Sequence, residues 1–191
     1  MLIRSEQVLA GTHPQLFLGG ACALWNEEGE QRNTGRDPIA AWLDEQGLSY
    51  FDPQIHMSTH GRDYEWELDG PVEKKVRLEA GMRIYEITPY SLASATMFEI
   101  FDDARRGRRS LVWFNHGDDY APAGLGNFKV VAANDVLKEQ VGVLVHAHMV
   151  GFLKAGKRMR MELCAMLDDC PQITIADSEA QVRDAITTRF K

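Results

Sequence analysis

Short apolar runs alternate along the chain with segments whose apolar residues recur at i, i+3 and i+4. The runs end in glycine, proline or polar residues, which is typical of buried strands. The segments between them have the spacing of amphipathic helices. Strands are predicted at 15–18, 48–51, 83–88, 110–114 and 172–175. Helices are predicted at 37–47, 71–80, 96–106 and 178–189, with a helix-rich stretch at 133–168.

This alternation of strands and helices is typical of a parallel sheet covered on both faces. We expect one α/β domain over residues 1–191, with a three-layer, flavodoxin- or Rossmann-like architecture and a five-stranded parallel sheet. Residues 1–14 are expected to form a leader strand or a loose arm. Residues 26–36 and 54–70 are expected to be polar loops. Ligands of such sheets bind beyond the carboxyl ends of the strands.

Composition narrows the function classes. The chain has 191 residues, 45% of them hydrophobic and 26% charged, with a net charge of −7. These values are typical of a folded protein, and the acidic balance disfavours non-specific binding to nucleic acid. The longest apolar run, 141–153, is shorter than the roughly 20 residues of a membrane span, so none is predicted. The three cysteines lack CxxC spacing, so we expect no disulfide framework and a reducing, cytoplasmic setting.

Glu99 is the clearest candidate for chemistry. It follows a strand end and a turn of small residues, and we expect it in the first turn of a helix. Free N–H groups and the helix dipole would keep a carboxylate ionised there, facing the ligand crevice. Such a group can act as a nucleophile or stabilise a cation in glycosyl transfer. The alternative is an acid that only complements the dipole.

Three stretches carry a family resemblance: FLGGA at 17–21, EITP at 86–89 and MFEI at 97–100. With them the sequence resembles the nucleoside 2-deoxyribosyltransferase superfamily, which includes 2'-deoxynucleoside 5'-monophosphate N-glycosidases, over residues 15–115. The resemblance implies cleavage of an N-glycosidic bond in a 2-deoxyribose ligand, with Glu99 attacking the anomeric carbon or shielding the oxocarbenium ion. We expect neither metal nor cofactor. It also implies a homo-oligomer, because pockets of this superfamily are commonly completed across a subunit interface; the segment 133–168 is the expected contact.

The remaining site residues are expected around Glu99. Gly19 and Gly20 would form the sugar or phosphate cradle, and hydroxyls of the turn would replace the glycines usual in the family; these are Ser91, Ser94 and Thr96. The departing base needs a proton donor. Glu73 fits the family spacing and Asp69 fits the residue type; both are alternatively solvated acids at a helix start. Asp63, in the long loop, is a further candidate.

Two other groups have open interpretations. His56 and His60 lie in a loop, where their spacing does not predict a metal site, so none is expected. The basic run RRGRR at 105–109 could recognise phosphate, or could simply complement the negative end of a helix.

The sequence therefore predicts an N-glycosyl hydrolase or 2-deoxyribosyl transferase acting on a small-molecule nucleoside or nucleotide. A non-catalytic nucleotide-binding module of the same fold is the alternative, because the stretch 80–82 lacks the Asp that family members carry before the third strand. A structural, oligomer-forming protein is a third interpretation. No nucleic acid or membrane partner is expected.

Overall fold

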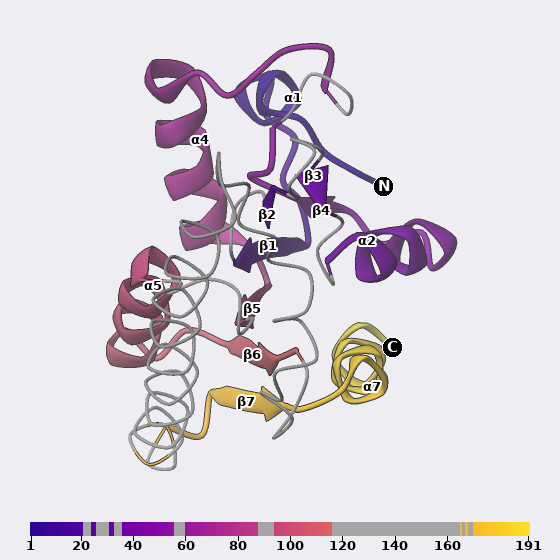
Figure 1. The fold of residues 1–191 in the computed structure, drawn as a ribbon, viewed down its shortest axis with the longest axis vertical. Helices are drawn as coiled ribbons and strands as arrows, with labels where there is room; N and C mark the ends of the chain where they lie inside the picture. Colours follow the sequence, from indigo (N-terminus) through magenta and orange to yellow (C-terminus); the bar gives the residue numbers. More distant parts are fainter. Residues whose placement is uncertain are drawn as a thin grey trace, which may run out of the picture.

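A five-stranded parallel sheet with helices on both faces forms the centre of the molecule (Figure 1). The structure, a computed structural model, describes residues 1–20, 24–25, 31–32, 36–55, 60–87, 94–115, 165, 167 and 170–191. The predicted three-layer, Rossmann-like α/β architecture is confirmed.

The strands of the sheet are parallel and stand in the order β4-β1-β5-β6-β7. Their bounds are Leu16–Gly20 for β1, Tyr50–Phe51 for β4, Met82–Ile87 for β5, Ser110–Phe114 for β6 and Ile173–Ala176 for β7. The chain moves from β1 outward to β4 and then crosses back to β5. The winding direction therefore reverses between β1 and β5, which is where sheets of this kind form their ligand crevice.

The helices divide between the two faces (Figure 1). Their bounds are Ser5–Leu9 for α1, Arg36–Glu45 for α2, Trp66–Glu79 for α4, Ser94–Arg105 for α5 and Glu179–Phe190 for α7. α1, α4 and α5 share one apolar core with the sheet, and α2 and α7 share the other. Alternate residues of a strand point to opposite faces. Phe17 accordingly lies in the first core, and its neighbours Leu16 and Leu18 lie in the second.

Several predicted boundaries are close to the observed ones. β6 has the predicted bounds, and α7 begins after Ser178, whose side chain accepts a hydrogen bond from the backbone N–H of Gln181 at 3.3 Å. Such N-caps satisfy backbone donors at the start of a helix. The predicted helical stretch 133–168 lies outside the described residues, except for residues 165 and 167.

Two expectations about local structure were wrong. Residues 1–14, expected as a leader strand or a loose arm, include a strand-like bridge between Leu2 and Tyr50 but then form the helix α1, which was not expected. α4 begins at Trp66 rather than at Pro71, which lies inside the helix. The early start is possible because the Asp69 carboxylate accepts the backbone N–H of Glu65 at 2.8 Å, and because proline removes only one helical hydrogen bond.

The expected polar loop at 26–36 also contains regular structure. A separate antiparallel pair joins β2 (Leu24–Trp25) to β3 (Gln31–Arg32), and α2 begins at Arg36. Among the described residues, no helix has the length and apolarity needed to cross a membrane.

Candidate functional site

Gly20 and Glu86 stand opposite each other at the reversal point of the sheet. Gly20 has a φ of +146°, and a Cβ there would lie 2.8 Å from the carbonyl oxygen of Glu86. A Cβ on Gly19 would lie 2.6 Å from the ring of Tyr85. The predicted cradle glycines thus lie at the expected strand end. The space beside them is filled by β5, so their lack of a side chain allows the two strand tips to approach closely.

A buried polar cluster, the strand-tip relay, extends across the same edge of the sheet. Arg36, at the start of α2, is only 1% exposed, and its Nη1 donates to the Leu18 carbonyl at 3.2 Å and to Asp52 Oδ1 at 3.3 Å. Its Nε lies 3.9 Å from Oε2 of the fully buried Glu86. Asn115 Nδ2 donates to Glu86 Oε1 at 2.5 Å. These contacts join the ends of β4, β1, β5 and β6 in sheet order.

The sequence interpretation missed the strand-tip relay as a polar site. The available signal was Glu86 itself, an acid within the otherwise apolar strand RIYEIT. Buried carboxylates need charged or hydrogen-bonding partners, so this residue could have been expected to recruit some. The partners come from distant segments, and nothing in the local pattern identifies Arg36 or Asn115.

Glu99 lies in the second turn of α5, because this helix begins at Ser94 and has no acid in its first turn. The expected dipole-stabilised position was therefore wrong. The side chain is 25% exposed, and its Oε1 lies 3.6 Å from Nε of Arg77 on α4. Burial raises the pKa of Glu99 to about 7; the charges of Glu73 and Asp103 add to this effect, and Arg77 opposes it. The carboxyl is therefore poised between its two protonation states near neutral pH, rather than held ionised.

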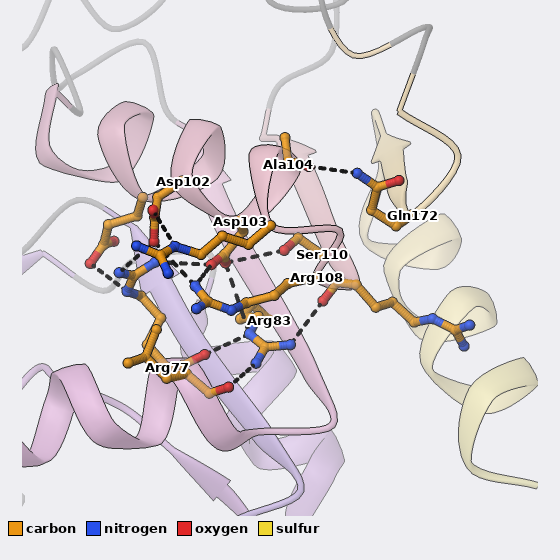
Figure 2. A network of polar contacts seen from close by, with 12 residues as sticks. Arg77, Arg83, Asp102, Asp103, Ala104, Arg108, Ser110 and Gln172 are labelled. Carbon is orange, nitrogen blue, oxygen red and sulfur yellow. Dashed lines mark hydrogen bonds and ion pairs between the residues drawn. The ribbon is translucent and has the colours of Figure 1, made fainter.

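Arg77 does not neutralise Glu99 fully because other acids share it (Figure 2). Its Nη1 donates to Asp103 Oδ1 at 2.9 Å, and its Nη2 lies 3.4 Å from Asp102 Oδ2. Asp103 is fully buried and also binds Nη1 of Arg108 at 3.0 Å. The network fixes the position of Arg77 and leaves Glu99 at its margin.

Glu73, one of the two predicted proton donors, lies partly buried on α4. Tyr64 donates its hydroxyl to Oε2 at 3.1 Å. Burial raises the pKa of Glu73 more than this bond and the charges of Arg36 and Arg77 lower it. The charge of Glu73 also raises the pKa of Glu99, so the two carboxyls interact. Such coupled carboxyls tend to divide into one acid and one base.

Asp69, the other predicted donor, has a different environment. It is fully buried, and its two oxygens bind Nη1 and Nη2 of Arg62 at 2.7 Å each. Ser5 Oγ donates to it at 2.7 Å, and the Glu65 N–H donates as well. Burial alone would raise the pKa of Asp69, but these hydrogen bonds outweigh it and hold the pKa at about 2. A carboxylate held in this way suits an anchor between α1 and α4 better than a proton donor.

The other predicted residues lie at varying distances from this centre. Thr96 is buried in the first turn of α5, which starts at Ser94, and Ser91 lies outside the described residues. Asp63 is exposed, and its carbonyl accepts Nη1 of Arg62 at 3.0 Å. Within the part of the chain that the structure describes, no three His, Cys, Asp or Glu side chains group as metal ligands do.

No known protein family and no curated protein matches the chain. The fold defines it as a doubly wound α/β protein. The site adds coupled carboxyls on α4 and α5 and a polar relay at the strand tips.

Proposed function

We propose that this protein is an N-glycosyl hydrolase or 2-deoxyribosyl transferase acting on a nucleoside or nucleotide. The observation that carries the proposal is the interaction of Glu73 and Glu99, two glutamates on helices of the same face, each with a raised pKa. Cleavage of a glycosidic bond by a retaining mechanism needs one carboxylate as nucleophile and one carboxylic acid as proton donor.

The charges around the pair suggest which glutamate has which role. Arg77 contacts Glu99 directly and favours its ionised form. Among the described residues, the direct partner of Glu73 is the neutral hydroxyl of Tyr64, and Arg77 acts on Glu73 only through its charge. Glu99 would attack the anomeric carbon and form a glycosyl ester as the bond to the base breaks. Glu73 would give its proton to the departing base. Water or a second base would then cleave the ester, with Glu73 taking a proton back from water in the hydrolytic case.

The test is release of free base from a panel of 2'-deoxynucleosides and their 5'-monophosphates. Glu99→Gln and Glu73→Gln should each lower the rate by about 100-fold or more, since general acid and nucleophilic groups contribute at least that much. Glu67→Gln is the matched control, because Glu67 is an exposed glutamate on the same helix as Glu73. Release at the wild-type rate by Glu99→Gln would remove this residue from the mechanism.

A second measurement separates the two roles. A substrate whose base departs without protonation should restore much of the rate of Glu73→Gln and none of that of Glu99→Gln. If a nucleotide raises the melting temperature of the protein but is cleaved in none of these assays, the result would instead favour a binding module. The proposal also includes assembly into a homo-oligomer and a cytoplasmic location. Sedimentation of the full chain measures its oligomeric state.

A further inference from the structure

A hollow of about 390 Å³ lies at the edge of the sheet where the strands begin, away from Gly20 and Glu86. Its volume falls within the roughly 300–1,000 Å³ of small-molecule sites. It is formed by the starts of β5, β6 and β7 on one side and by α7 on the other. Its lining includes Met82, Arg109, Gln172, Thr174, Thr188 and Arg189.

The lining of this hollow is positive, although the chain as a whole carries a net charge of −7. Of the described residues that line it, two are arginines, Arg109 and Arg189, and none is acidic. Within the described residues, neither guanidinium takes part in an ion pair; Arg189 only stacks over the Phe190 ring at 5.8 Å. Two unpaired cations in one hollow favour an anionic ligand.

Arg109 is the last residue of the basic run at 105–109, and its neighbours in this run have other partners. Arg106 Nε binds Asp102 at 2.6 Å and Arg108 Nη1 binds Asp103 at 3.0 Å, so each of these two arginines already has an acidic partner. Gly107, at a φ of +65°, turns the chain at the end of α5 towards β6. The last arginine of the run then stands at the start of β6, beside the hollow.

Hydrogen bonds to neighbouring segments hold the walls of the hollow, and Figure 2 shows the one from Gln172 to Ala104. The Arg109 carbonyl accepts the backbone N–H of Arg83 at 3.3 Å. The side-chain amide of Gln172 donates to the Ala104 carbonyl at 2.8 Å, and the backbone carbonyl of Gln172 accepts the backbone N–H of Ser110 at 3.1 Å. The backbone of Arg109 and the side chain of Gln172 are therefore held in place before any ligand binds, which lowers part of the entropic cost of binding.

α7 supplies the other wall. Ala185, Thr188 and Arg189 have the i, i+3, i+4 spacing of one helix face. The last carbonyls of a helix carry partial negative charge, which disfavours an anion. The attraction must therefore come from the arginines, and binding should depend on both.

We propose that this hollow is a second ligand site that binds the phosphoryl group of a small phosphorylated molecule. Arg109 and Arg189 would hold the phosphate oxygens, because the guanidinium group matches this geometry with paired donors. The Thr188 hydroxyl would donate a further hydrogen bond. Its helical wall is α7, which covers the opposite face of the sheet from α4 and α5, the helices that carry Glu73 and Glu99, so the site is separate from the proposed glycosidic chemistry.

Calorimetric titration of the full chain with inorganic pyrophosphate at low ionic strength tests the proposal. We expect saturable binding that weakens as salt is added. Arg109→Gln and Arg189→Gln should each lower the affinity by about tenfold, since hydrogen bonds to charged groups contribute at least that much. Arg105→Gln removes an exposed arginine of α5 outside the lining and should leave the affinity unchanged.

Absence of saturable binding to the wild-type chain would overturn the proposal, as would equal losses in Arg105→Gln and the two pocket variants. Circular dichroism melting of each variant verifies that the fold is retained. Glu99→Gln should bind pyrophosphate like the wild type, and a changed affinity in this variant would place the anion at the other site and refute ours. The titration uses no nucleoside, so its result tests the second site whether or not the protein releases base from nucleosides.

Discussion

Asp69 and Glu99 lie on helices that cover the same face of the sheet, yet their surroundings move their pKa values in opposite directions. Burial would raise the pKa of Asp69, but the paired donors of Arg62 outweigh it and hold the pKa at about 2. Glu99 is also partly buried, and its only described cation, Arg77, is shared with Asp102 and Asp103. The number of hydrogen bonds that a carboxylate accepts, rather than its burial, distinguishes an anchoring carboxylate from one that can exchange protons.

The raised pKa of Glu99 predicts a pH-dependent stability. The folded state holds the proton up to about pH 7, whereas the unfolded chain releases it near the ordinary glutamate pKa of 4.5. The contribution of Glu99 is therefore fully present below pH 4.5 and is lost as the pH rises towards about 7. The glutamine of Glu99→Gln cannot ionise, so the variant does not lose this contribution as the pH rises. Over this window, its free energy of unfolding should therefore increase relative to that of the wild type by on the order of 3 kcal/mol.

Urea unfolding of both proteins at about pH 5 and about pH 8 measures this difference. Glu67→Gln controls for the loss of one negative charge from the same face. A gap between Glu99→Gln and the wild type that does not change with pH would show that the carboxyl titrates normally.

At the scale of elements, the contact between β1 and β5 is governed by Gly20. Its φ of +146° is one that side chains rarely adopt, and its missing Cβ leaves room for the backbone of Glu86. Strand tips that approach so closely at the reversal point set the width of any crevice there.

Gly20→Ala should therefore lower the free energy of unfolding by at least about 2 kcal/mol, because backbone strain and a clash with a carbonyl act together. Gly47→Ala is the matched control: Gly47 has a φ of +68° but faces open space. Its cost should be about 1 kcal/mol, from the left-handed conformation alone. Equal losses in the two variants, measured by urea unfolding, would show that the close approach of β5 contributes nothing.

Sequence patterns predicted the helices and strands whose boundaries are determined by their own residues. β6 is a continuous apolar run and α7 has its own N-cap, so both were found close to their observed bounds. α1 was missed because its stability is tertiary: Val8 is buried against the core, and Ser5 bonds to Asp69 on α4. Local propensity does not register such contacts.

The candidate site divides in the same way. Glu73 and Glu99 could be singled out as acids near a strand end, although the helix position of Glu99 was wrong. The strand-tip relay could not be assembled from the sequence, because the pairing of Arg36 with Asp52 and Glu86 depends on strand order and register.

At the scale of the whole molecule, the relay joins four neighbouring strands at one edge of the sheet. Removal of one partner from a buried charged cluster leaves the other charges uncompensated, which costs about 3–5 kcal/mol. Arg36→Met should lower the free energy of unfolding by this amount. Arg36→Met/Glu86→Gln also removes one of the two opposing charges, the other being that of Asp52, and should recover part of the loss. Strictly additive losses in the double-mutant cycle would mean that the two residues do not interact.

The order of the strands also bears on how the chain reaches its folded state. β7 joins β6 across the long stretch between Phe114 and Ile173, so this pairing carries the largest loop-closure entropy of the sheet. We infer that β7 and α7 dock late in folding. Until then β6 is an edge strand whose backbone N–H and C=O groups can pair with another chain. The apolar side chains of Leu111 and Trp113 also remain uncovered until α7 packs against them. A nascent or truncated chain that ends before residue 170 would thus be at particular risk of aggregation.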